Sequence, residues 1–146
     1  MTKRFQRVAD WPRLLNEHIM QSQAAYLEGG LRWGEFDCCT FAFDWVARIT
    51  DLDPMAEYRG RYETREEAIR ALWGHGDKTL FGALVRVFGD PVSPAQAQRG
   101  DIAFRDDEGG AIGIIHTIGA RQIGIFLGDD GFTIVEVKNI DHAFIV

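Results

Sequence analysis

The stretch Trp33-Gly34-Glu35-Phe36-Asp37-Cys38-Cys39-Thr40-Phe41-Ala42-Phe43-Asp44-Trp45 decides the fold expected for this chain. It predicts a helix that begins after Asp37, because a carboxylate placed before an apolar run can accept a hydrogen bond from an unpaired first-turn amide. Apolar residues then recur at spacings of three and four as far as Ile49, which places them on one wide face. The helix is expected to end at about Thr50, ahead of a proline, because the residue before proline avoids helical geometry.

Both cysteines of the chain lie at the start of this helix. Cys38 would sit in the first turn, where unpaired amides and the helix dipole favour a thiolate, so it is a candidate nucleophile. A buried helix with two small residues at its start would give the same pattern, because free cysteine is among the most buried residue types. Cys39 is interpreted as a packing residue. A disulfide between the two is not expected, since the peptide joining adjacent cysteines would have to distort.

The composition indicates one ordinary folded domain over residues 1–146, with 46% apolar and 26% charged residues. The net charge of -6 leaves no basic footprint for nucleic acid. No apolar run approaches the ~20 residues that a membrane span requires. The basic segment 1–7 has no apolar region behind it, so we expect no signal peptide and synthesis in the cytoplasm.

Helices are expected first and strands second. After Gly100 the apolar period changes from helical to alternating, and Asp/Gly clusters at 106–110 and 129–131 are typical of hairpin turns. The fold class predicted is therefore α+β, with N-terminal helices packed on a C-terminal, mostly antiparallel sheet. The expected helices span about 10–29, 38–50, 64–73 and 79–88, and the expected strands span 101–105, 111–117, 121–128, 132–138 and 143–146.

Residues 54–63 are expected to form a loop in which tyrosine and arginine alternate. In one interpretation Tyr58 and Tyr62 pin the loop to the body of the protein. In the other, the loop is one wall of a groove for a substrate or partner.

Three segments resemble the NlpC/P60 family of papain-like cysteine peptidases. Phe36-Asp37-Cys38-Cys39-Thr40-Phe41 is similar to the nucleophile motif, and Arg99-Gly100-Asp101-Ile102-Ala103-Phe104 is similar to the strand that opens the sheet. The segment 53–62 resembles small NlpC/P60-like proteins encoded by phages and prophages. The resemblance implies a papain-like fold, in which a helix bearing cysteine packs against a sheet bearing histidine.

The same resemblance implies a base, which in this family is a histidine that opens a strand of the form His-apolar-Gly-apolar. Two strands here have that form without the histidine. Spacing places Ala111 at the base position, and the motif match places Gln122 there. Neither side chain is a usable base near neutral pH, so Cys38 lacks its expected partner.

Two other histidines are alternative bases. His116 lies five residues past Ala111, but strand alternation puts it on the opposite face, so a bulge would have to turn it inward. His142 begins the last strand and would approach from a different edge. His18 is expected to be a partly exposed residue of the first helix. The four histidines and the cysteine pair lack metal-ligand spacing, so neither a metal nor another cofactor is expected.

Two functional hypotheses follow from the resemblance. In one, the chain is an NlpC/P60-like domain that has lost catalysis and is a structural or assembly component of a bacteriophage tail, located in the virion with tail-hub or tail-tip proteins as partners. A cell-wall binding module is a second role left open for such a silent domain. In the other, it is a peptidoglycan endopeptidase in which Cys38 attacks an amide of the stem peptide and His116 serves as base. The retained Asp37-Cys38 pair favours the peptidase, and the missing histidine favours the tail component.

Overall fold

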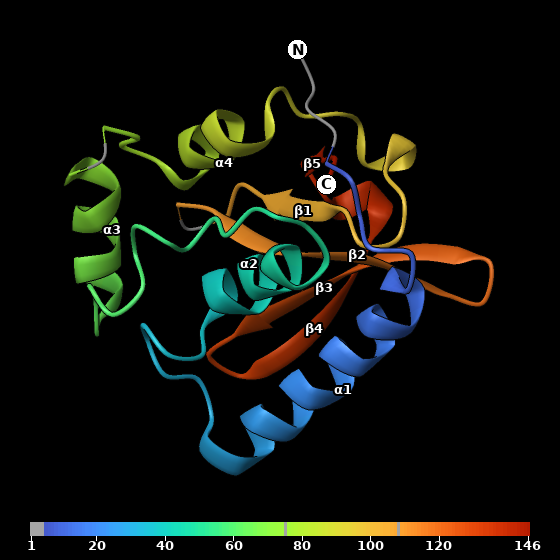
Figure 1. The fold of residues 1–146 in the computed structure, drawn as a ribbon, viewed down its shortest axis with the longest axis horizontal. Helices are drawn as coiled ribbons and strands as arrows, with labels where there is room; N and C mark the ends of the chain where they lie inside the picture. Colours follow the sequence, from blue (N-terminus) through green and yellow to red (C-terminus); the bar gives the residue numbers. More distant parts are fainter. Residues whose placement is uncertain (1–4, 75, 108) are drawn as a thin grey trace.

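An antiparallel sheet follows four helices in this computed structural model, which describes residues 5–74, 76–107 and 109–146 (Figure 1). The α+β prediction is confirmed. The helices are α1 (Trp11–Gly29), α2 (Cys38–Ile49), α3 (Arg65–Gly74) and α4 (Leu80–Phe88), with short 3-10 turns at η1 (Pro94–Gln96) and η2 (Val137–Asn139). The strands are β1 (Ile102–Arg105), β2 (Ala111–Ile118), β3 (Arg121–Gly128), β4 (Gly131–Glu136) and β5 (His142–Phe144).

The strands form one sheet in the order β4-β3-β2-β1-β5, and every neighbouring pair is antiparallel. Two tight hairpins set the register of β2, β3 and β4. Ile118 pairs with Arg121 across the turn between β2 and β3, and Gly128 pairs with Gly131 across the turn between β3 and β4. Residues 129 and 130 therefore form the two-residue hairpin that the Asp-Asp-Gly sequence predicts.

The two faces of the sheet are covered differently. Ile112 and Ile114 of β2 face the helices and join the main hydrophobic core, which includes the fully buried Trp45 of α2. Ile115, on the opposite face of the same strand, belongs to a smaller cluster that also contains Ala97 and Ile140. Because strand side chains alternate between faces, even-numbered residues of β2 look toward α2 and odd-numbered residues look away.

The C-terminal half of α2 is tied to one end of β2. The Trp45 indole Nε1 donates to the Gly100 carbonyl oxygen at 2.8 Å, and the Gly100 amide donates to the Ile115 carbonyl oxygen at 2.8 Å. Cys38 lies seven residues earlier in α2, which is about 10 Å along the helix axis. The Cys38 turn therefore lies about two helical turns away from the point where α2 is tied to β2.

Asp101, which follows Gly100 in the segment that opens the sheet, has a structural role. Its carboxylate is buried and pairs with Arg7 at 2.7 Å. It also accepts hydrogen bonds from the amides of Gln98 and Val146 at 2.9 and 3.1 Å. The carboxylate thus joins the beginning and the end of the described chain to β1.

One local prediction needs correction. His18 is buried, not partly exposed, because its Nε2 donates to the Phe41 carbonyl oxygen at 2.8 Å and its ring stacks on that of Phe41. At the start of α3, Thr64 accepts from the Glu67 amide as a cap. The Glu67 carboxylate accepts from the amide of Glu63, one residue earlier than a capping box requires.

Within the described residues, no helix combines the length and the apolar character needed to cross a membrane.

Candidate functional site

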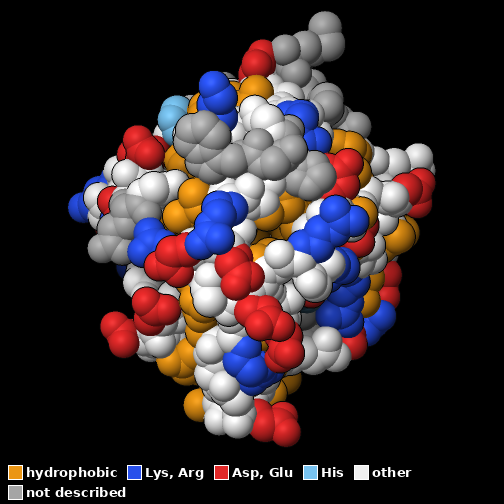
Figure 2. Space-filling model, turned by 90° about the vertical axis from the view of Figure 1, so that its left-hand side faces the viewer, with side chains coloured by type: hydrophobic (Ala, Val, Ile, Leu, Met, Phe, Trp, Pro, Cys, Tyr) orange, Lys and Arg blue, Asp and Glu red, His pale blue; other side chains and the backbone are white. Residues whose placement is uncertain are grey.

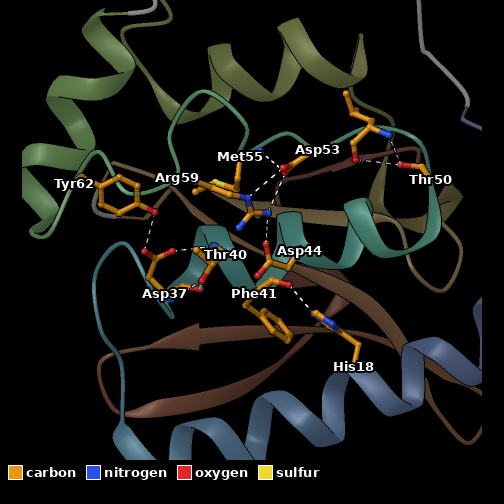
Figure 3. Close-up of polar contacts among 11 residues, drawn as sticks. His18, Asp37, Thr40, Phe41, Asp44, Thr50, Asp53, Met55, Arg59 and Tyr62 are labelled. Atoms are coloured by element: carbon orange, nitrogen blue, oxygen red, sulfur yellow. Dashed lines mark hydrogen bonds and ion pairs between the residues drawn. The ribbon is translucent and has the colours of Figure 1, made fainter.

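Asp37 organises the start of α2 (Figure 3). Its fully buried carboxylate accepts hydrogen bonds from the Thr40 amide at 2.9 Å, the Gly34 amide at 2.8 Å and the Tyr62 hydroxyl at 2.8 Å. The Thr40 hydroxyl oxygen accepts in return from the Asp37 amide at 2.8 Å, which completes a capping box. Asp37 is therefore the N-cap that the sequence predicts, and it also holds two neighbouring segments.

Gly34 permits this arrangement. It has a positive φ of 85°, which side-chain-bearing residues rarely adopt. A Cβ at this position would also collide with the carbonyl oxygen of Tyr62. The segment before α2 can therefore lie directly against the backbone of the 53–63 loop.

The 53–63 loop is held to α2 by a second set of contacts (Figure 3). The Arg59 guanidinium binds the carboxylates of Asp44 in α2 and Asp53 at 2.5 and 3.0 Å. The Tyr58 hydroxyl donates to Asp77 at 3.0 Å, which ties the loop to the segment before α4. The interpretation of the loop as a segment pinned by its tyrosines is confirmed, since both are buried.

A pocket of about 120 Å³ opens between this loop, the first turns of α2, α3, α4 and the turn that precedes β2. Cys38 and Cys39 lie at its α2 side, and Met55 and Tyr62 line it from the loop. Arg65 is the one charged side chain among the described residues of the lining, and the rest is mainly aliphatic and aromatic. The loop is thus one wall of a pocket, and Cys38 opens onto that pocket.

The two thiols are not equivalent. The pKa of the Cys39 thiol is raised well above its usual value by its hydrogen bond with Cys38, by burial and by electrostatic interaction with the neighbouring Cys38 and Asp37. Cys39 therefore stays a neutral thiol near neutral pH and is not a proton acceptor for Cys38.

His116 is placed at the far end of β2 from this pocket. Its Nδ1 accepts a hydrogen bond from Arg99 Nε at 3.4 Å, and it is absent from the pocket lining. Burial and the Arg99 charge lower its pKa. β2 has no bulge between residues 113 and 118, and its regular alternation already places His116 on the face that looks toward α2, so the bulge expected from the sequence is not needed. The part of β2 that holds His116 nevertheless lies beside the Trp45 turn of α2. The structure does not bring His116 to Cys38.

Ala111 and Gln122 both lie on the face of the sheet turned away from α2. Ala111 packs on the smaller hydrophobic cluster. The Gln122 side-chain amide donates to the carbonyl oxygens of Ala97 and Pro94, at 2.6 and 3.2 Å, and so closes that cluster. Neither position faces Cys38.

None of the three described histidines lines the pocket. His142 in β5 packs between aromatic rings, 4.9 Å from Phe81 and 6.3 Å from Phe104, and His18 is held by the Phe41 carbonyl. Within the part of the chain that the structure describes, no three His, Cys, Asp or Glu side chains are arranged to hold a metal ion.

Residues 6–146 match the model of a family described as "Domain of unknown function (DUF6950)". The chain belongs to the DUF6950 family. No curated protein matches it, and no solved structure does. The DUF6950 match includes α2, the 53–63 loop, the pocket and the whole sheet, so these parts belong to one family domain.

The pocket of this DUF6950 chain could be anticipated from sequence only in part. The alternation of tyrosine and arginine in 54–63 was the available signal for a wall. Nothing local indicates that Tyr62 reaches Asp37, 25 residues earlier, or that α3 and α4 close the pocket.

Proposed function

We propose that this DUF6950 chain is a catalytically silent NlpC/P60-like domain that serves as a structural or assembly component of a phage tail tip or hub. One observation supports the proposed lack of catalysis: no described histidine lies beside Cys38. The phage setting is supported by the resemblance of residues 53–62 to small NlpC/P60-like proteins of phages and prophages.

The chemistry of the pocket supports this loss. A cysteine nucleophile of this class needs an adjacent base that takes its proton and later returns it to the leaving group. Cys39 does not supply that base, because its raised pKa keeps it protonated. His116 is held by Arg99 at the other end of α2. A thiol with no positioned base is a weak catalyst for amide hydrolysis.

A second candidate function has one observation in its favour. Cys38 is the first residue of α2, at the positive end of the helix dipole, and it lines a pocket. This placement is the one that a peptidoglycan cysteine endopeptidase acting on stem peptides would use.

Hydrolysis separates the two functions. Purified peptidoglycan is incubated with the wild-type chain and with Cys38→Ser, and released muropeptides are measured by liquid chromatography and mass spectrometry. The proposal expects the same products from both proteins and from buffer. New fragments that appear with the wild type and vanish with Cys38→Ser would overturn catalytic silence.

The tail assignment has its own test. Phage particles that encode the chain are purified by density gradient, and tails are analysed by mass spectrometry and by immunogold labelling. The chain is expected in stoichiometric amounts at the tail tip. Its absence from purified tails, with the chain present in the infected cell lysate, would overturn the assignment whatever the result for hydrolysis.

A further inference from the structure

We propose that the pocket beside Cys38 and Cys39 receives one bulky apolar side chain, of leucine or phenylalanine size, from an extended segment of a partner polypeptide. The proposal gives the proposed assembly role its partner contact, and it rests on that role.

The size of the pocket sets the size of its occupant. A volume of about 120 Å³ is close to the ~150 Å³ of an apolar cavity that holds one benzene. Sites for cofactors and drug-sized ligands measure roughly 300–1,000 Å³. The pocket therefore fits one aromatic or branched aliphatic group and excludes a nucleotide or a similar cofactor.

The groups that line the pocket favour an apolar occupant. The two tyrosine hydroxyls nearest to it are already committed, Tyr62 to Asp37 and Tyr58 to Asp77. Most of the remaining lining is carbon and sulfur, which gains free energy by excluding water from an apolar group.

Charge complementarity indicates what flanks the apolar residue. Arg65, in the first turn of α3, is the charged member of the described lining. A carboxylate next to the inserted side chain would be attracted to that guanidinium. We therefore expect the partner segment to carry an acidic residue beside its apolar anchor.

The pocket is preformed, which lowers the free energy needed to fill it. Arg59 and Tyr62 hold the loop wall against α2 through Asp44 and Asp37. On the face that carries α3, hydrophobic side chains stay visible between charged ones, so a partner can reach apolar surface there (Figure 2). A polypeptide adds backbone and flanking contacts that a free molecule of this size lacks.

Cys38 provides a built-in reporter for occupancy. The rate of its alkylation by N-ethylmaleimide is measured by mass spectrometry in the Cys39→Ala variant, with saturating acetylated and amidated tripeptides Gly-Leu-Glu, Gly-Phe-Glu or Gly-Ser-Glu. We expect the leucine and phenylalanine peptides to slow the reaction at least fivefold and the serine peptide to leave it unchanged. Equal protection by all three peptides, or protection by none, would overturn the proposal.

Matched variants test whether the protecting peptide binds in the pocket. Ala68→Trp fills the pocket from α3 and should remove the protection, whereas Ala24→Trp on the exposed side of α1 should not. Should Ala68→Trp fail to fold, Ile69→Lys places a charge at the half-exposed rim and should weaken binding at least fivefold. Protection that survives in a folded pocket variant would place the peptide elsewhere and refute this site.

Two further comparisons test the acidic residue expected beside the apolar anchor and the kind of peptide that fills the pocket. Gly-Leu-Gln should bind more weakly than Gly-Leu-Glu, and Arg65→Gln should abolish that difference. Better protection by an alanyl-glutamyl stem-peptide fragment than by Gly-Leu-Glu would identify a peptidoglycan site and overturn the proposal. Because these readouts use neither hydrolysis nor phage particles, the pocket proposal can fail while the tail assignment stands, and the reverse.

Discussion

The Tyr62 hydroxyl donates to Oδ2 of Asp37 at 2.8 Å, and this bond joins the 53–63 loop to the residue that caps α2. The same carboxylate oxygen accepts from the Gly34 amide. One buried side chain thus holds the segment before α2, the first turn of α2 and one wall of the pocket. The cysteines take their positions from this network, because Cys38 is the first residue of the capped helix.

Replacement of Asp37 by alanine is expected to lower the free energy of unfolding by about 2–4 kcal/mol, since it removes a helix cap and leaves the buried Tyr62 hydroxyl without its acceptor. Urea denaturation followed by circular dichroism measures the change. Asp10→Ala is the matched control, because Asp10 precedes α1 without any side-chain cap hydrogen bond. Equal losses in the two variants would contradict the central role of Asp37.

The stability of the fold is expected to decrease in mild acid through His18. Burial is the main cause that lowers its pKa below the usual 6.5, so near and below that pH the unfolded chain binds a proton that the native state does not. The contribution of His18 is fully present above pH 6.5 and is lost as the pH falls through the lower native pKa.

Unfolding free energies of the wild type and of His18→Gln at pH 7.5, 6.5 and 5.5 test this. Glutamine retains a side-chain donor for the Phe41 carbonyl but does not titrate. The wild type should lose more stability than the variant between pH 6.5 and 5.5. The same loss of unfolding free energy in both proteins would show that His18 has the same pKa in the native and unfolded states. The contribution of His116, whose pKa is also lowered, cancels because both proteins keep that residue.

The two thiols are expected to react at different rates. In Cys38→Ser, the remaining Cys39 stays half-buried beside Asp37, and the partial loss of water and the nearby Asp37 both raise its pKa. Its alkylation by iodoacetamide at pH 7.5 should be at least ~10-fold slower than that of Cys38 in Cys39→Ser, since only the thiolate reacts. The pseudo-first-order rates of the two single-cysteine variants are compared by mass spectrometry. A faster Cys39 would contradict the interpretation of Cys39 as the packing thiol.

Gly113 in β2 is expected to tolerate no side chain. A Cβ there would collide with the carbonyl oxygen of Ile125 in β3 and would lie 2.9 Å from the Phe126 ring. Gly113→Ala should therefore destabilise the protein by about 1–3 kcal/mol through overpacking. Gly128→Ala, at the end of β3 and free of contacts within 4 Å, should change stability by no more than ~0.5 kcal/mol. Thermal denaturation of both variants decides between packing at Gly113 and a general intolerance of strand substitutions.

The amino-acid sequence by itself determined the elements that depend on neighbours along the chain. The cap at Asp37, the apolar spacing of α2 and the Asp-Asp-Gly hairpin are local features, and their bounds in the structure agree closely with expectation. The antiparallel pairing from β1 to β4 followed from short turns between alternating strands, because a short turn permits no other pairing of the strands it joins. The pairing of β5 with β1 joins segments that are far apart along the chain, and only the tertiary structure decided it.

Only the tertiary structure decided which side chains meet. The burial of His18 depends on the carbonyl of Phe41, 23 residues away, and the pocket depends on three helices and a loop closing around Cys38. The distance between His116 and Cys38 follows from the alignment of the Trp45 turn of α2 with one end of β2, and no local pattern encodes it. Periodicity assigns a residue to a face of its own element, whereas a site requires the relative positions of several elements, and long-range packing sets those positions.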